Sequence, residues 1–180
     1  MNIRICGTGS ALPERKITND DLSQIMDTSD EWISSRTGIK TRHLATEETT
    51  TSLATEAAKK ALADADMKPE EVELIIAATV TPDHLVPTLS CEVQREIGAV
   101  NAVAFDLGAA CSGFLFALST AQAYIASGRF KNALLIGAEV LSKIMDWNDR
   151  STCVLFGDGA AAAVITLGDG IYASYLAMDA

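Results

Sequence analysis

The sequence predicts an α/β protein with a largely parallel sheet and helices on both faces. Antiparallel strands are an alternative for the part of the chain after residue 153. Its apolar runs are short and nearly continuous, as at residues 72–80 and 132–141, which is typical of strands covered on both faces. Segments with helical spacing alternate with these runs, as in βα units. The chain has 180 residues and shows no internal repeat or linker, so we expect one domain over residues 1–180.

The first 65 residues predict one strand and then three helices. Residues 3–12 form an apolar run that stops before Pro13, and we expect a buried strand there. Capping residues or apolar periodicity mark the helices. These are residues 18–26 with Thr18 or Asn19 as N-cap, residues 28–38 with Ser29 or Asp30 as N-cap and Gly38 as left-handed stop, and residues 50–65, where Leu53, Ala57, Ala61 and Ala65 recur at helical spacing.

The middle of the chain alternates strands and helices, with a proline-bounded loop between the first two. In order, we expect a strand at 72–80, a loop at 81–87, a helix at 88–97 ending at Gly98, a strand at 101–107 and a helix at 111–127 ending at Gly128. The last helix is apolar on all sides, which predicts a buried rather than an amphipathic helix.

The last third predicts three strands. In order, we expect a strand at 132–141, an irregular polar segment at 146–152, a glycine turn that leads into a strand within 156–168, and a closing strand at 170–177.

Composition excludes several classes of function. The net charge is −10, which argues against a general nucleic-acid or anionic-membrane surface, although a local arginine cluster would still bind an acidic ligand. The longest apolar runs, such as 74–80, are far shorter than the roughly 20 residues of a membrane span. Residues 1–15 lack the pattern of a secretory signal. The four cysteines are scattered without a C-x-x-C pair, so we expect neither zinc nor disulfides, and a cytoplasmic location.

Cys111 lies where a strand ends and an apolar helix begins. Unpaired backbone N–H groups at a helix start carry partial positive charge, which stabilises a thiolate and can hold the oxyanion of a thioester under attack. The neighbours Gly108, Ala109, Ala110 and Gly113 are small and leave room for a substrate. The residues by themselves leave two interpretations open, a packed core cysteine and a nucleophile.

Four stretches, in order and at matching spacing, resemble a known family. They are GTGSALPE at 7–14, TSDEWISSRTGIKTRH at 28–43, AFDLGAACSGFLFALSTA at 104–121 and RSTCVLFGDGAAAAV at 150–164. Together they resemble the N-terminal half of β-ketoacyl-acyl-carrier-protein synthase III, which starts bacterial fatty-acid synthesis. The resemblance implies a thiolase-like fold, here the N-terminal half of an αβαβα layered sandwich with a mostly parallel mixed sheet.

The resemblance also implies the roles of individual residues. Cys111 matches the nucleophile, which takes an acyl group from a short acyl-coenzyme A and passes it, with decarboxylation, to malonyl-acyl carrier protein. Trp32 and Arg150 match the residues on the two faces of the adenine of coenzyme A, a pairing that suits flat groups. Arg36 matches a phosphate contact, and Thr28 lies in the same patch.

The same resemblance implies a homodimer formed through residues 101–107. Val86 matches the residue that reaches across this dimer and closes the acyl pocket, and a valine there leaves room for primers longer or more branched than acetyl. No metal or redox cofactor is implied.

The remaining candidates are weaker. Cys6, Cys91 and Cys153 lie in apolar stretches without a helix start, and we interpret them as packing residues. Asp106 is expected to be a structural, hydrogen-bonded carboxylate. The family does not use the position of His84.

The family's histidine and asparagine lie in H-Q-A-N and G-N-T-S segments, and neither segment occurs in these 180 residues. We therefore expect the N-terminal half of a synthase, unable to condense by itself. Two alternatives are another thiolase-fold acyl-coenzyme A condensing enzyme, and a non-catalytic half that serves dimerisation or binding.

Overall fold

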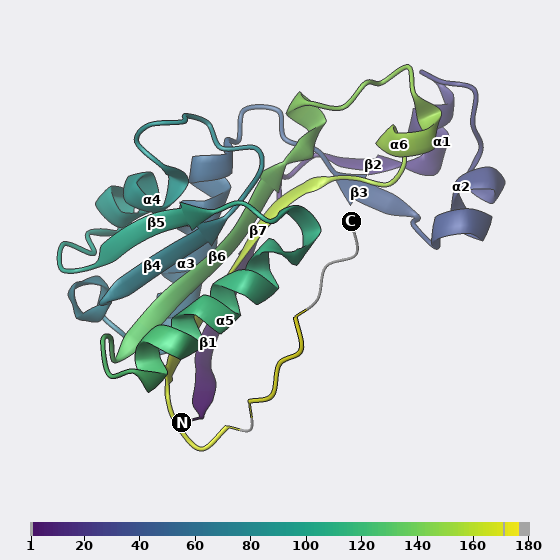
Figure 1. Cartoon of the computed structure of the whole chain (residues 1–180). Coiled ribbons are helices and arrows are strands. Elements are labelled where there is room, and N and C mark those ends of the chain that lie inside the picture. The colour runs from purple at the N-terminus through teal and green to yellow at the C-terminus, as the bar shows by residue number, and fades with distance from the viewer. Residues whose placement is uncertain (1, 171, 177–180) are drawn as a thin grey trace.

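The computed structural model describes residues 2–170 and 172–176. Its centre is a five-stranded mixed sheet with the order β1-β7-β6-β4-β5 (Figure 1). The strands are β1 (Ile3–Ala11), β4 (Leu74–Ala78), β5 (Val103–Leu107), β6 (Asn132–Val140) and β7 (Asp158–Leu167). β4 pairs in parallel with β5 and β6, whereas β7 is antiparallel to both β6 and β1. The parallel pairing expected from the sequence thus holds for one half of the sheet. Both antiparallel pairings involve β7, which follows residue 153.

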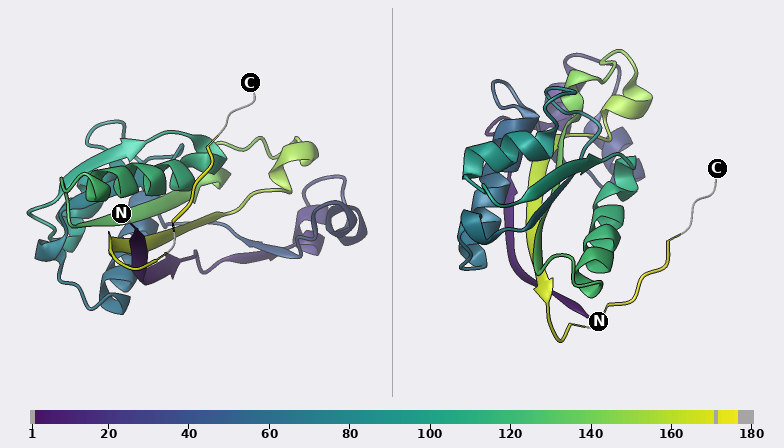
Figure 2. Two further views of the ribbon diagram at one scale, coloured as in Figure 1. Left: turned by 60° about the horizontal axis from the view of Figure 1, so that its bottom comes forward. Right: turned by 60° about the vertical axis from the view of Figure 1, so that its left-hand side comes forward.

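Helices cover both faces of the sheet (Figure 2). One face carries α3 (Thr50–Asp64) and α4 (Leu89–Ile97), and the other carries α5 (Gly113–Ala126). Each face has its own apolar cluster of buried side chains. The contact of α3 with β1 is close, because a methyl group added at Gly7 or Gly9 would meet the backbone of α3. The glycines of the GTGS stretch therefore let a strand lie directly on an alanine-rich helix.

A smaller unit extends from one end of the sheet (Figure 1). It contains the two-stranded sheet of β2 (Lys16–Thr18) and β3 (Thr41–His43) with the short helices α1 (Asn19–Ser23), α2 (Asp30–Thr37) and α6 (Arg150–Cys153). A separate apolar cluster, which includes Leu22, Ile33 and Cys153, holds it together. The caps are the expected ones: Thr18 caps α1, Ser29 caps α2, and Gly38 ends α2 at φ 73°.

Several expectations are corrected. Residues 3–12 do not form a buried strand, since β1 is an edge strand whose side chains are partly exposed. The strands β2 and β3 were not expected, because each has only three residues. The polar segment 146–152 is not wholly irregular, since α6 begins at Arg150, capped by Asp149. The closing strand expected at 170–177 is absent from residues 172–176, and residues 171 and 177 lie outside the described part.

The prediction that helix 111–127 is buried was wrong. Only one face of α5 is buried. Its buried residues are Gly113, Ala117, Ala121 and Ile125, whereas Leu115 is 58% exposed. The buried face packs on the sheet, and within the described residues only the extended segment 172–176 passes the opposite side (Figure 2). A helix sequence that is apolar on all sides does not tell which of those sides have a neighbour. None of the helices in the described ranges is long and apolar enough to cross a membrane.

Candidate active site

Cys111 lies at the junction between β5 and α5. It belongs to a 3₁₀ turn, Ala110–Ser112, that precedes the regular helix, and Ala110 adopts a positive φ of 44°. The helix itself therefore begins at Gly113, two residues later than expected. Gly113 fits closely against the side chain of Ala78 in β4, and no side chain caps the start of α5. The thiol of Cys111 is exposed, beside a helix start that lacks a side-chain cap.

A cavity of about 520 Å³ adjoins the thiol. The ends of β4 and β6 form one side of it, and the start of α5 forms another. Its lining is almost wholly apolar and consists of Ala78, Val80, Ala110, Cys111, Phe114, Gly137, Ala138, Glu139, Leu141 and Phe156. This cavity combines a nucleophilic sulfur with apolar walls, which suits an acyl chain attached to that sulfur.

A second cluster of candidate residues lies in the smaller unit. The guanidinium carbons of Arg36 and Arg150 lie 4.5 Å and 5.1 Å from the ring centroid of Trp32. Arg36 follows Trp32 by one helical turn, so α2 alone brings these two together, whereas Arg150 comes from α6. Arg150 donates hydrogen bonds to the backbone oxygen and carboxylate of Asp27, and Arg36 donates to the backbone oxygen of Trp32.

Thr28 immediately precedes the N-cap of α2. Its hydroxyl oxygen is buried and has no hydrogen-bond partner. A cavity of about 260 Å³ lies beside Trp32 and Arg36. The structure thus brings Trp32, Arg36 and Arg150 together around one aromatic ring, with a buried, unpartnered hydroxyl nearby in the chain.

Nearly the whole chain is similar to known proteins. The family described as 3-oxoacyl-[acyl-carrier-protein (ACP)] synthase III matches residues 105–180. A β-ketoacyl-[acyl-carrier-protein] synthase III from Clostridium acetobutylicum is 56% identical over 180 residues, which cover 99% of this chain and 55% of that protein. The crystal structure of a 3-oxoacyl-[acyl-carrier-protein] synthase III from Aquifex aeolicus superposes with a TM-score of 0.92 at 55% identity, covering 94% of this chain and 55% of that one. The chain corresponds to the N-terminal portion of β-ketoacyl-[acyl-carrier-protein] synthase III.

The chain spans about half the length of the curated synthase III relatives that it matches. A priming β-ketosynthase from the R1128 polyketide pathway also has the same fold, with a TM-score of 0.90 at 39% identity over 93% of this chain and 51% of that one. The fold is therefore that of a thiolase-like protein, in the part that carries Cys111.

Val86, predicted to close an acyl pocket, falls outside the thiol cavity. Val86 is 85% exposed on the loop between β4 and α4 and does not line the cavity of its own chain.

The weaker candidates have structural partners. Asp106 accepts hydrogen bonds from the backbone N–H groups of Leu89 and Ser90 and so caps α4, the structural role expected for it. His84 Nδ1 lies 2.7 Å from a carboxylate oxygen of Glu92. In the part of the chain that the structure describes, no cluster of His, Cys, Asp and Glu could hold a metal ion.

Sequence reasoning did not identify most of the cavity wall, including Val80 and Glu139. A signal for Glu139 was present, because it is the only charged residue in the strand NALLIGAEV.

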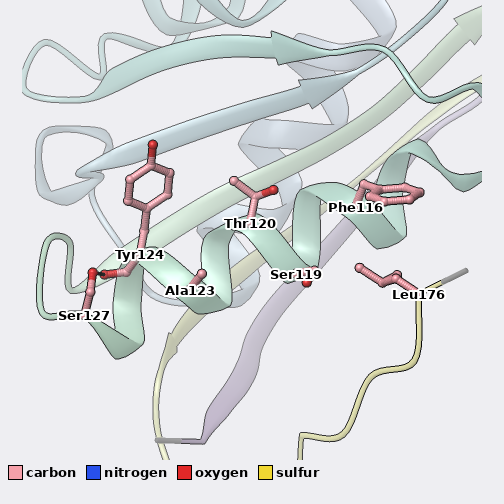
Figure 3. Close-up of a pocket in the computed structure, with 7 residues that line it drawn as sticks. All are labelled: Phe116, Ser119, Thr120, Ala123, Tyr124, Ser127 and Leu176. Atoms are coloured by element: carbon pink, nitrogen blue, oxygen red, sulfur yellow. Dashed lines mark hydrogen bonds between the residues drawn. The ribbon is translucent and has the colours of Figure 1, made fainter.

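A second cavity, similar in volume to the thiol cavity at about 530 Å³, lies between the side of α5 and Leu176 (Figure 3). It holds hydroxyl and aromatic groups but no thiol, carboxylate or amine, so we place the candidate site at Cys111.

Proposed function

We propose that Cys111 is the nucleophile of a synthase III reaction. The sulfur attacks the thioester of a short acyl-coenzyme A, coenzyme A leaves as its thiol, and the acyl group remains on the cysteine. Malonyl-acyl carrier protein then loses CO₂, and the resulting carbanion equivalent attacks the acyl-cysteine to release 3-oxoacyl-acyl carrier protein. The observation that carries this proposal is an exposed thiol at the start of α5, beside an apolar cavity. The proposed setting is the start of fatty-acid synthesis in the cytoplasm.

Helix geometry supports the first step. Backbone N–H groups at the start of α5 point toward the side on which Cys111 lies, and they favour negative charge on the sulfur and on the thioester oxygen. Passing the acyl group through a cysteine divides one difficult transfer into two easier ones. The proposed chemistry requires no metal or redox cofactor.

The cluster around Trp32 is proposed to bind coenzyme A. Trp32 and Arg150 would stack on the adenine, Arg36 would meet the phosphates, and Thr28 would contribute its unpartnered hydroxyl. Two stacked contacts of about 3.5 Å each need about 7 Å between the planes, whereas Arg150 lies 5.1 Å from the Trp32 centroid. Arg150 must therefore move outward from Trp32 to admit a purine between them.

Val86 is proposed to act across a dimer. Its exposed side chain would close the acyl pocket of a second subunit, and its small size favours primers longer than acetyl. Replacing it with phenylalanine in the complete enzyme should then restrict the primers to short acyl groups.

The test of the proposed function is acylation by acetyl-coenzyme A, followed by intact-mass analysis and peptide mapping. We expect an acetyl group on Cys111 that is absent in Cys111→Ser and retained in the matched control Cys91→Ser. A chain that stays unmodified would instead support a non-catalytic binding or dimerisation role. Because H-Q-A-N and G-N-T-S segments are absent from these residues, the chain alone should not condense malonyl-acyl carrier protein. Repeated turnover by residues 1–180 alone would contradict this assignment.

A second candidate function is priming of a polyketide pathway, which the likeness to the R1128 priming ketosynthase favours. The same cysteine chemistry would serve it. The carrier protein distinguishes the two candidate functions. In polyketide priming, the acyl-enzyme would react with malonyl groups on a polyketide carrier rather than on the fatty-acid carrier.

A further inference from the structure

The turn after β4 is held by a carboxylate from the neighbouring strand β6. One carboxylate oxygen of Glu139 accepts a hydrogen bond of 2.8 Å from the backbone N–H of Val80. The other oxygen accepts hydrogen bonds from the hydroxyls of Thr79 and Thr81. Three donors from three successive residues therefore converge on one side chain.

Thr81 ties the same turn to two further elements. Its hydroxyl accepts a hydrogen bond of 2.9 Å from the backbone N–H of Val140, and its carbonyl accepts one of 2.6 Å from the hydroxyl of Thr50 in α3. Thr81 is buried. Because both ends of this network are bonded within the core, residues 79–81 have little freedom to move.

The turn forms part of the wall of the thiol cavity. Val80 and Glu139 both line the cavity that contains Cys111. Val80 is nearly half exposed, which places its side chain at the mouth of the cavity rather than at the bottom. The position of this turn therefore sets how wide the cavity is on that side.

We propose that Glu139 is a positioning residue that determines the size of the acyl group Cys111 accepts. It acts through the turn 79–81 and through Val80, not by contact with the reacting atoms. A glutamine in its place offers one oxygen acceptor and an NH₂ group that only donates, so at least one donor of the turn loses its partner. The freed turn then lets Val80 move, and the cavity discriminates less between short and long chains. This inference rests on the proposed role of Cys111 as the carrier of the acyl group.

The experiment measures size selectivity at Cys111 without coenzyme A. Folded chains of residues 1–180 are treated with methyl and hexyl methanethiosulfonate, and modification of Cys111 is followed by mass spectrometry. The cysteine thiolate attacks the sulfenyl sulfur, a disulfide forms, and methanesulfinate leaves with the electron pair of the broken S–S bond. The measured quantity is the ratio of the hexyl to the methyl rate constant.

We expect Glu139→Gln to change this ratio about fourfold or more, which corresponds to the burial of one methylene group. Val80→Ala should change it in the same direction, because it enlarges the same wall directly. Glu92→Gln is the matched control. Glu92 is also a largely buried carboxylate and accepts hydrogen bonds from Thr51 and His84, but it does not line the cavity. It should leave the ratio unchanged.

Three outcomes overturn the inference. In the first, Val80→Ala changes the hexyl-to-methyl ratio but Glu139→Gln does not. In the second, neither substitution changes the ratio. The third is a ratio that Glu139→Gln changes but Val80→Ala does not, because the proposed effect acts through Val80. If circular dichroism shows that Glu139→Gln is unfolded, Thr81→Val replaces it under the same criteria, because it removes one donor to Glu139 and keeps the side-chain shape. Failure of acetyl-coenzyme A to acylate Cys111, together with an altered size ratio, contradicts the proposed function and leaves the role of Glu139 in the cavity intact.

Discussion

Individual thiols in this chain differ in exposure and in charge environment. Cys111 is exposed, Cys6 and Cys91 are partly buried, and Cys153 is buried. Burial raises the pKa of the Cys153 thiol, and the negative charge of Asp149 raises it further. Since the thiolate is the reactive form, these differences order the four cysteines by reactivity.

We expect iodoacetamide to label Cys111 first and Cys153 last. Brief labelling of the folded chain at neutral pH, followed by peptide mapping, measures the order. Labelling in concentrated urea is the control, because unfolding removes the differences in burial and should bring the four rates together. Equal labelling of Cys6, Cys91 and Cys111 in the folded chain would argue against an activated thiol.

At the level of elements, the start of α3 depends on a carboxylate outside the helix. Asp83 accepts hydrogen bonds from the backbone N–H groups of Thr50 and Thr51 and pairs with Lys143. Burial by itself would raise the pKa of Asp83, but the hydrogen bonds from Lys143 and Thr51 outweigh it and hold the pKa well below its ordinary value. This contact joins the loop that carries Val86 to the helix.

Asp83→Asn should therefore lower the free energy of unfolding at neutral pH by about 2 kcal/mol. Because the pKa is lower in the folded state, the contribution of Asp83 is complete above the unfolded value near 3.8 and is lost as the pH falls below it. Urea titrations at several pH values should show the difference between the two proteins shrinking below about pH 4. Asp20→Asn, on the exposed side of α1, is the control. A difference that stayed constant down to the lowest pH would show that the charge of Asp83 is not responsible.

The contact between β1 and α3 predicts a packing defect. In Gly9→Ala the new methyl group would meet the backbone of Ala57 and Ala61, and such overpacking costs about 1–3 kcal/mol. Urea unfolding measures the loss. Gly108→Ala is the matched control, since a methyl group there meets no atom within 4 Å. Equal stability of the two variants would mean that the strand can move away from the helix at little cost.

At the level of the whole molecule, β5 is an open edge of the sheet. Val103 on this strand is 51% exposed, and Val100 in the preceding turn is 75% exposed. An unpaired apolar edge strand pairs readily with another strand, and a twofold axis would let two copies of β5 satisfy each other.

We predict a homodimer formed through residues 101–107, and light scattering at micromolar concentration should detect it. Val103→Lys should shift the population to monomer, because the charge would be buried at the new interface. Ile5→Lys makes the same change on the opposite edge strand, where Ile5 is also exposed, and should leave the dimer intact. A native chain that is monomeric throughout this range would contradict the prediction.

The sequence by itself determined the longer helices and most of the longer strands, and it placed Cys111 where a strand ends and a helix begins. Ser29 and Gly38 mark the ends of α2 because a cap bonds to backbone groups only a few residues away. The place of Cys111 between an apolar strand and an apolar helix is likewise a local property. The family resemblance then pointed to Trp32, Arg36 and Arg150, and the structure brings these three together.

Only the tertiary structure decided which surfaces are covered and which distant residues meet. The outer side of α5 is exposed although its sequence is apolar, because burial depends on a neighbour that the helix sequence does not specify. The hydrogen bonds that Glu139 accepts from residues 79–81 depend on the parallel register of β4 and β6, which brings Ala78 beside Gly137. Val86 lies away from the thiol cavity of its own chain, on a loop in which Asp83 bonds to the distant start of α3. Caps and turns are set by residues close in the sequence, whereas these contacts are set by how distant strands pair.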